Sequence, residues 1–136
     1  MALALGDYNL GFLFHIIIET PALFNFFVFP SKQLGTHTPH AHAVIRQYAV
    51  LILTSNLVAL NFVWRPVDEL SGKIAGALAV YHIAPSVRSI IRLQRQAHDG
   101  RPLIPSEAFL YLVVHTICGA ALFLHFRTGM WSTTTS

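Results

Sequence analysis

The most constraining feature of the sequence is an apolar run from Phe12 to Phe29 that carries one carboxylate near its midpoint. The run is rich in Phe and Ile, and it is long enough to cross a bilayer as a helix. Glu19 lies at its middle, where a charged side chain costs about 3 kcal/mol on insertion scales. Such a carboxylate needs either a partner or a bound proton. His15 precedes Glu19 by four residues and therefore lies on the same helix face.

The composition indicates a multi-pass integral membrane protein with no additional soluble domain. The chain has 136 residues, of which 54% are hydrophobic and only 11% are charged, against about 25% charged in soluble domains. The net charge of +3 comes from a few Arg residues at loop edges, not from a basic face, so no nucleic-acid partner is expected. Cys118 is the only cysteine, which excludes an intrachain disulfide. The N-terminal segment lacks a basic region before its first apolar run, and we expect it to be retained.

Four apolar segments predict an all-α, integral membrane four-helix bundle that forms one domain over residues 1–136. Pro30 and Pro66 mark the ends of the first two helices, and Ser106 is a typical residue at a helix start. Gly72 and Gly76 form part of a stripe of small residues that lets another helix approach closely. The predicted spans are 8–29, 43–64, 71–92 and 106–126.

The basic residues are distributed unequally between the two ends of the predicted bundle. The loops after the first and third spans share one side with Lys32, Arg46, Arg88, Arg92, Arg95 and Arg101. The opposite side has only Arg65, Lys73 and Arg127. Because cytoplasmic loops carry the excess of Lys and Arg, both termini are expected on the lumenal or outer side. For a eukaryotic source, the endoplasmic reticulum is the expected membrane.

Each predicted span carries a polar or ionisable side chain at about the same depth. Glu19, His82 and His115 lie near the midpoints of three spans, and residues at one depth can converge inside a bundle. Ionisable groups inside a membrane are costly, and they are candidates for a functional site by default. We therefore predict that these three residues are catalytic. The residues expected to contact the substrate are His15, Asn25, Arg46, Asn56 and Tyr81.

These residues favour an enzyme that acts on a lipophilic small molecule by acid–base chemistry. Burial disfavours the charged form of Glu19, which could then donate a proton while His82 or His115 accepts one. Isomerisation or cyclisation would suit such a site. We expect no cofactor and no metal, because no pair of potential ligands on one helix includes a midplane histidine. The expected partners are the substrate and membrane lipids.

Two alternatives remain open at this stage. The same three residues form a set of two histidines and one carboxylate, which suits non-haem iron. The chain could instead be a non-enzymatic subunit that binds lipid or a protein partner, or a small carrier. Four helices are few for a carrier, which would therefore need a homo-oligomer.

Several short segments resemble known families of small membrane proteins. The sequence Glu19-Thr20-Pro21, the segment RQYAVL and the small-residue third span resemble the DoxX-like group. The Phe-rich first span and the segment YHIAPSVRSIIRL resemble four-span proteins of fungal secondary-metabolite pathways, which include the anthrone oxygenases. The resemblance implies a four-span architecture and a role in secondary metabolism, with an anthrone-type oxygenase as a further alternative, and it assigns no role to any residue.

Overall fold

The computed structural model describes residues 9–34 and 38–132 and confirms an all-α fold with four helical segments long and apolar enough to span a membrane. No strand occurs among these residues. The third span consists of two consecutive helices, α3 and α4, and the other spans are single helices. The elements are α1 (Leu10–Val28), a 3-10 turn η2 (Pro30–Gln33), α2 (Pro39–Leu60), α3 (Glu69–Tyr81), α4 (Ile83–His98) and α5 (Glu107–Ser132).

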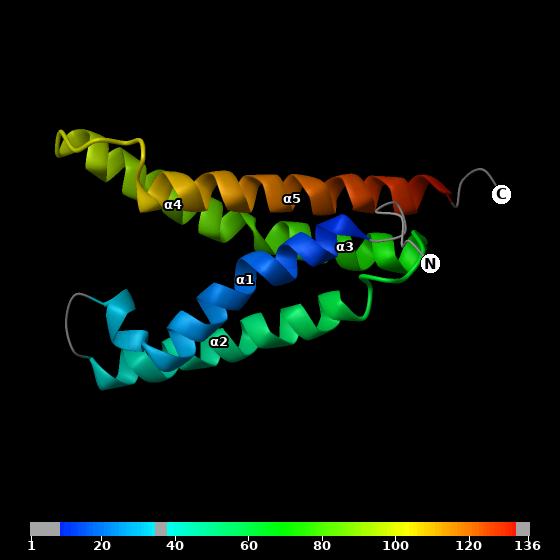
Figure 1. Cartoon of the computed structure of the whole chain (residues 1–136), viewed down its shortest axis with the longest axis horizontal. Helices are drawn as coiled ribbons and strands as arrows, with labels where there is room; N and C mark the ends of the chain where they lie inside the picture. The colour runs from blue at the N-terminus through cyan, green and yellow to red at the C-terminus, as the bar shows by residue number, and fades with distance from the viewer. Residues whose placement is uncertain (1–8, 35–37, 133–136) are drawn as a thin grey trace, which may run out of the picture.

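The helices form two arms that meet at one end and diverge at the other (Figure 1). One arm is the hairpin of α1 and α2, and the other contains α3, α4 and α5. Helix α1 also packs against α5, which joins the arms near the beginning of α1. The α1–α2 connection and the α4–α5 connection lie at the divergent end (Figure 1). These are the two connections predicted to face the cytosol.

The beginning of α1 is tied to the turn that follows α2. The side-chain amide of Asn9 donates to the backbone oxygens of Phe62 and Arg65, and its backbone N–H donates to the oxygen of Val63. These bonds satisfy carbonyl groups that lie outside helix geometry. Helix α2 ends at Leu60, four residues before the expected end, because the chain turns at this point to meet Asn9.

Helix α2 also begins four residues earlier than expected, at Pro39. Proline is favoured in the first helical position because its missing N–H would have no partner there. Asp68 caps α3 by accepting a hydrogen bond from the backbone N–H of Ser71. Ser106 caps α5 in the same way through the N–H of Phe109, at the helix start predicted from the sequence.

The third span is interrupted at His82, which lies between α3 and α4. Pro85 has no N–H to donate to the carbonyl of Tyr81, four residues earlier, and this missing bond explains why α3 ends there. The sequence predicted one helix over 71–92, whereas the structure has two helices that together extend from Glu69 to His98. The interruption places the His82 ring inside the bundle, where its exposed fraction is 2%.

Small residues bring α3 and α5 into close contact, as the stripe in the third span predicted. A Cβ atom placed on Gly129 would lie 2.7 Å from the backbone oxygen of Asp68 and 2.8 Å from the Cα atom of Gly72. A Cβ on Gly76 would lie 2.9 Å from the ring of Phe126. Only glycine permits the backbone approach at Gly129, and a Cβ on Gly72 would lie 3.1 Å from the Cα atom of Gly129, which is also tight.

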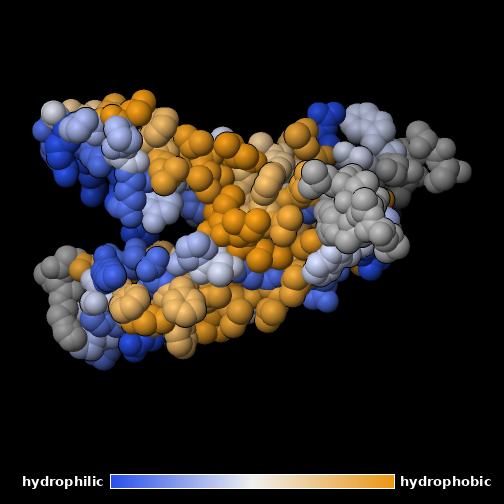
Figure 2. All heavy atoms as spheres, viewed as in Figure 1, coloured by the Kyte–Doolittle hydropathy of each residue, from blue (hydrophilic) through white to orange (hydrophobic). Residues whose placement is uncertain are grey.

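The outer surface of the molecule is largely hydrophobic, as expected for helices in contact with lipid (Figure 2). The exception is a notch that opens between the two arms at their divergent end, where the facing surfaces are mainly hydrophilic (Figure 2). The arms therefore enclose a polar region that is open toward the predicted cytosolic face.

Candidate functional site at the junction of the two arms

Three ionisable side chains from three different spans meet inside the bundle. The Nδ1 atoms of His82 and His115 are 3.0 Å apart. The Oε1 atom of Glu19 lies 3.5 Å from the Nδ1 atom of His115 and 3.8 Å from that of His82. Glu19 and His82 are almost completely buried. The structure thus brings together the three residues that the sequence singled out by depth.

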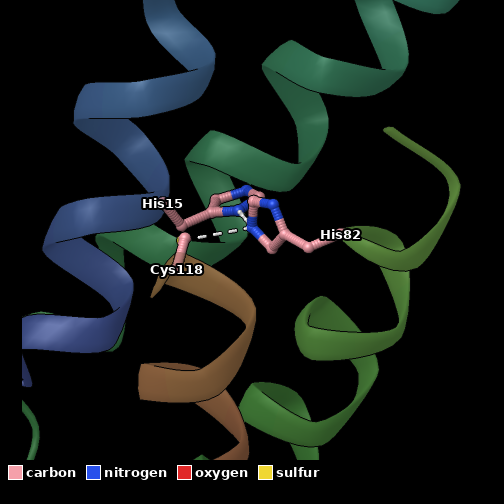
Figure 3. Close-up of side chains that lie close together, drawn as sticks. All are labelled: His15, His82 and Cys118. Carbon is pink, nitrogen blue, oxygen red and sulfur yellow. Dashed lines mark hydrogen bonds between the residues drawn. The ribbon is translucent and has the colours of Figure 1, made fainter. Parts of the chain in front are cut away.

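A second group lies on the opposite edge of the His82 ring (Figure 3). The Nε2 atom of His82 is 2.9 Å from the Nδ1 atom of His15 and 3.2 Å from the Sγ atom of Cys118. His15 comes from α1 and Cys118 from α5 (Figure 3). His82 is therefore the centre of the cluster, with one set of neighbours on each of its two ring nitrogens.

A chain of hydrogen bonds fixes which nitrogen of His82 carries the proton. The hydroxyl of Ser55 donates to the backbone oxygen of Ile52, so its oxygen accepts from the Nε2–H of His15 at 3.1 Å. Neutral His15 then has a free lone pair on Nδ1, which accepts from the Nε2–H of His82. The Nδ1 atom of His82 is consequently an acceptor. Its lone pair lies on the side of Glu19 and His115.

The two carboxylate oxygens of Glu19 have different surroundings. Tyr81 donates its hydroxyl proton to Oε2 at 3.0 Å, and Tyr48 lies 3.1 Å from the Tyr81 hydroxyl. The Oε1 atom is buried and has no hydrogen-bond partner among the described residues. The buried residues of the described chain include no Lys or Arg that could neutralise Glu19. A buried acceptor without a donor is costly and requires an explanation.

An apolar groove of about 840 Å³ reaches the cluster from the lipid-facing side. It lies between the third span and α5, and its walls include Val80, Ile83 and Phe123, which are exposed on the outer surface. His82 and His115 form part of its lining, whereas Glu19 does not. A hydrophobic molecule in the bilayer could therefore contact the two histidines without passing through water.

His115 is the member of the cluster best placed to contact a molecule in this groove. Its Nδ1 atom faces His82, and its Nε2 atom has no hydrogen-bond partner in the described ranges. The His115 side chain is 11% exposed and forms part of the groove lining. The ring consequently connects the buried carboxylate to the groove.

The five residues predicted to contact a substrate have different outcomes. His15 and Tyr81 belong to the cluster, through His82 and Glu19 respectively. Asn56 is buried but does not hydrogen bond to the cluster; its amide donates to the hydroxyl of Thr20, the residue after Glu19, at 3.4 Å. Asn25 and Arg46 are exposed, and neither hydrogen bonds to the cluster within the described chain. Arg46 instead donates to the backbone oxygen of Phe27. The prediction for these two residues used only their depth in the membrane, which does not determine which side of the helix they lie on.

Three members of the cluster were not predicted from the sequence. Cys118 follows His115 by three residues, a spacing that places both on one helix face and could have indicated its position. Tyr48 and Ser55 gave no such signal, because their contacts are to residues more than 30 positions away along the chain.

No known protein family, curated protein or solved structure matches the chain. The fold and the site therefore define the protein only as a multi-pass helical membrane protein with a buried histidine–carboxylate cluster.

Proposed function

We propose that this protein is a membrane-embedded enzyme that binds a lipophilic small molecule in the groove and transfers protons to or from it. The observation that carries this proposal is the apolar groove with His82 and His115 in its wall. Ligand sites are commonly apolar concavities that contain a few well-placed polar groups. A substrate would enter from the lipid and present one polar or acidic position to His115.

The roles of the residues follow from their positions. His115 would exchange a proton with the substrate through its Nε2 atom. Its Nδ1 atom would be coupled to His82 and Glu19, which lie 3.0 and 3.5 Å away. Tyr81 would position Glu19 through Oε2. Isomerisation and cyclisation are reactions of this type, since both can proceed by adding a proton at one position and removing one at another.

The cellular setting is a further part of the proposal. The resemblance to small proteins of secondary-metabolite pathways supports a hydrophobic metabolite as substrate, and the endoplasmic reticulum would be the membrane in a eukaryotic cell. An accessible groove at membrane depth is compatible with both.

Deuterium incorporation provides a test that does not require the substrate to be known. Membranes that contain the protein are incubated in D₂O with lipid extracts of the source cells, and the extract is screened by mass spectrometry for deuterium bound to carbon. We expect at least one lipid-soluble compound to be labelled with wild type. Glu19→Gln should reduce labelling by about a hundred- to ten-thousand-fold, the usual contribution of acid–base catalysis.

Matched variants make this test specific. Glu107→Gln changes an exposed glutamate that pairs with Arg92, and it should label normally. Ala120→Phe narrows the groove and should abolish labelling, whereas Ala43→Phe on the exposed surface of α2 should not. Full labelling by a well-expressed Glu19→Gln protein would refute the proton-transfer role. Co-purification of a lipophilic compound without any labelling would favour a non-enzymatic binding subunit instead.

A further inference from the structure

We infer that Glu19, His82 and His115 bind a divalent transition-metal ion such as Fe²⁺ or Zn²⁺. Their three facing atoms, Oε1 and the two Nδ1 atoms, form a triangle with edges of 3.0, 3.5 and 3.8 Å. The point equidistant from these atoms lies about 2.0 Å from each, and metal bonds to histidine nitrogen and carboxylate oxygen measure about 2.0–2.2 Å. An ion would therefore fit between them with little movement.

The unpartnered carboxylate oxygen is a second and independent observation. Without an ion, the Nδ1–H of His115 can donate to His82, but Glu19 Oε1 still has no donor within the described residues. The same two nitrogens lie 3.8 and 3.5 Å from it. A cation at the centre would satisfy all three acceptors at once and would neutralise the buried charge.

The groups behind the three ligands have the arrangement that metal sites require. The Nε2–H of His82 donates to His15, which is held by Ser55, and this fixes the tautomer whose Nδ1 lone pair faces the site. Tyr81 holds Oε2 of Glu19 and leaves Oε1 for the ion. Ligating side chains generally have such outer hydrogen-bond partners, which orient them and increase their basicity.

The second set of possible ligands, His15, His82 and Cys118, is a weaker candidate. Both sets contain a pair of histidine nitrogens within hydrogen-bond distance, but in this set the Nε2–H of His82 also has the Sγ atom of Cys118 as a neighbour, and the other nitrogen of His15 is bonded to Ser55. No member of that set is an unsatisfied buried atom. Both sets include His82, so an experiment that locates the ion at its Nδ1 or its Nε2 atom distinguishes them.

The sequence led us to expect no metal, since no ligand pair on one helix includes a midplane histidine. That reasoning applied to ligands on one helix, whereas the fold brings them together from three. Two histidines and one carboxylate leave coordination positions open, as in non-haem iron sites and catalytic zinc sites. This inference rests on the proposed substrate groove, but the ion would occupy the Oε1 and Nδ1 atoms that couple the three side chains, so its Lewis acidity would replace the proton relay among them. Metal binding is measured without turnover.

The test uses Co²⁺ as a spectroscopic probe on the full chain in nanodiscs. Protein is purified, analysed for iron and zinc, stripped with a chelator and titrated with Co²⁺. We expect one ion per chain with visible d–d absorption. Glu19→Gln and His115→Ala should each weaken binding at least a hundredfold. Tyr81→Phe, which removes only an outer partner, should weaken it about 10–100-fold.

Cys118→Ser is the control that locates the ion. We expect it to bind Co²⁺ as wild type does, and we expect no thiolate-to-metal charge-transfer band in the wild-type spectrum. Loss of binding in Cys118→Ser together with such a band would place the ion on the other edge of His82 and overturn the inference. A wild-type protein that binds no stoichiometric ion would also overturn it. Circular dichroism and thermal unfolding of each variant separate lost ligation from lost folding. Deuterium labelling that persists after chelation would leave the proposed function intact while removing the metal from it.

Discussion

The contact between α3 and α5 makes a quantitative prediction for Gly129→Ala. The added methyl group would lie 2.7 Å from the backbone oxygen of Asp68 and 2.8 Å from the Cα atom of Gly72. Carbon atoms prefer separations of about 3.5–4.0 Å, so the two helices must move apart by about 1 Å at this point. Both obstructing atoms belong to the backbone and cannot rotate away. Overpacking of this kind costs about 1–3 kcal/mol.

Gly76→Ala is the matched control for this prediction. Both substitutions replace a helical glycine with alanine, and each gains about 0.8–1.0 kcal/mol of helix propensity. At Gly76, however, the close atoms belong to the side chain of Phe126, which can shift about its χ1 torsion without moving either helix backbone. The difference in stability between the two variants therefore isolates the backbone clash. We expect Gly129→Ala to be less stable than Gly76→Ala by about 1–2 kcal/mol.

Reversible unfolding in mixed micelles with increasing SDS measures both free energies under one condition. A difference of 1.4 kcal/mol corresponds to a tenfold change in the equilibrium between folded and unfolded forms. Equal stability of the two variants, or a more stable Gly129→Ala, would show that α3 and α5 do not approach as closely as the structure has them. The glycine stripe would then have no packing role.

Two further predictions concern the membrane orientation and the cap of α3. A C-terminal tag should be protected from protease added to the cytosolic side of sealed vesicles. The reason is that the connections with most Lys and Arg lie at the opposite end of the bundle and are expected in the cytosol. Digestion of the tag would show that the membrane orientation is the opposite one. The hydrogen bond from the Ser71 backbone and the nearby Arg65 lower the pKa of Asp68 below its ordinary value. A lowered pKa stabilises the fold above the ordinary value and loses this effect as the pH falls through the folded-state value. Wild type should therefore lose more stability than Asp68→Asn in unfolding measurements between pH 6 and about pH 3; parallel profiles would contradict this role of the cap.

The number of spans could be predicted because it depends on local composition alone. Each apolar run is long enough to span a bilayer wherever the rest of the chain lies. The ends of the helices depend on more distant contacts. Helix α2 stops at Leu60 because the following turn bonds to Asn9, more than 50 residues away along the chain. The break at His82 did have a local signal in Pro85, which the prediction of a single helix did not use.

The depth of the candidate site in the membrane could be predicted from the sequence, but the direction in which each helix points its side chains could not. The three residues Glu19, His82 and His115 were grouped correctly because each lies near the midpoint of its span, and polar side chains at one depth converge in the interior of a bundle. The rotation of each helix about its own axis remained undetermined. The four-residue spacing already placed His15 on the face of Glu19, but nothing comparable fixed the rotation of α2, which leaves Arg46 exposed. The divergence of the two arms also depends on packing across the whole chain, and no single segment encodes it.

The chemistry at position 19 distinguishes a functional cluster from one that only holds the arms together. A structural network would be served better by glutamine, which can donate a hydrogen bond to a histidine and costs less than a carboxylate in a membrane. Glutamate instead leaves Oε1 without a donor at a site whose neighbouring atoms are acceptors or shared protons. A buried carboxylate oxygen without a donor is unfavourable unless it binds a proton or a cation that the chain itself does not supply. A proton in transit and a metal ion both meet this requirement, and Glu19→Gln removes the transferable proton and weakens metal binding while preserving the shape of the side chain.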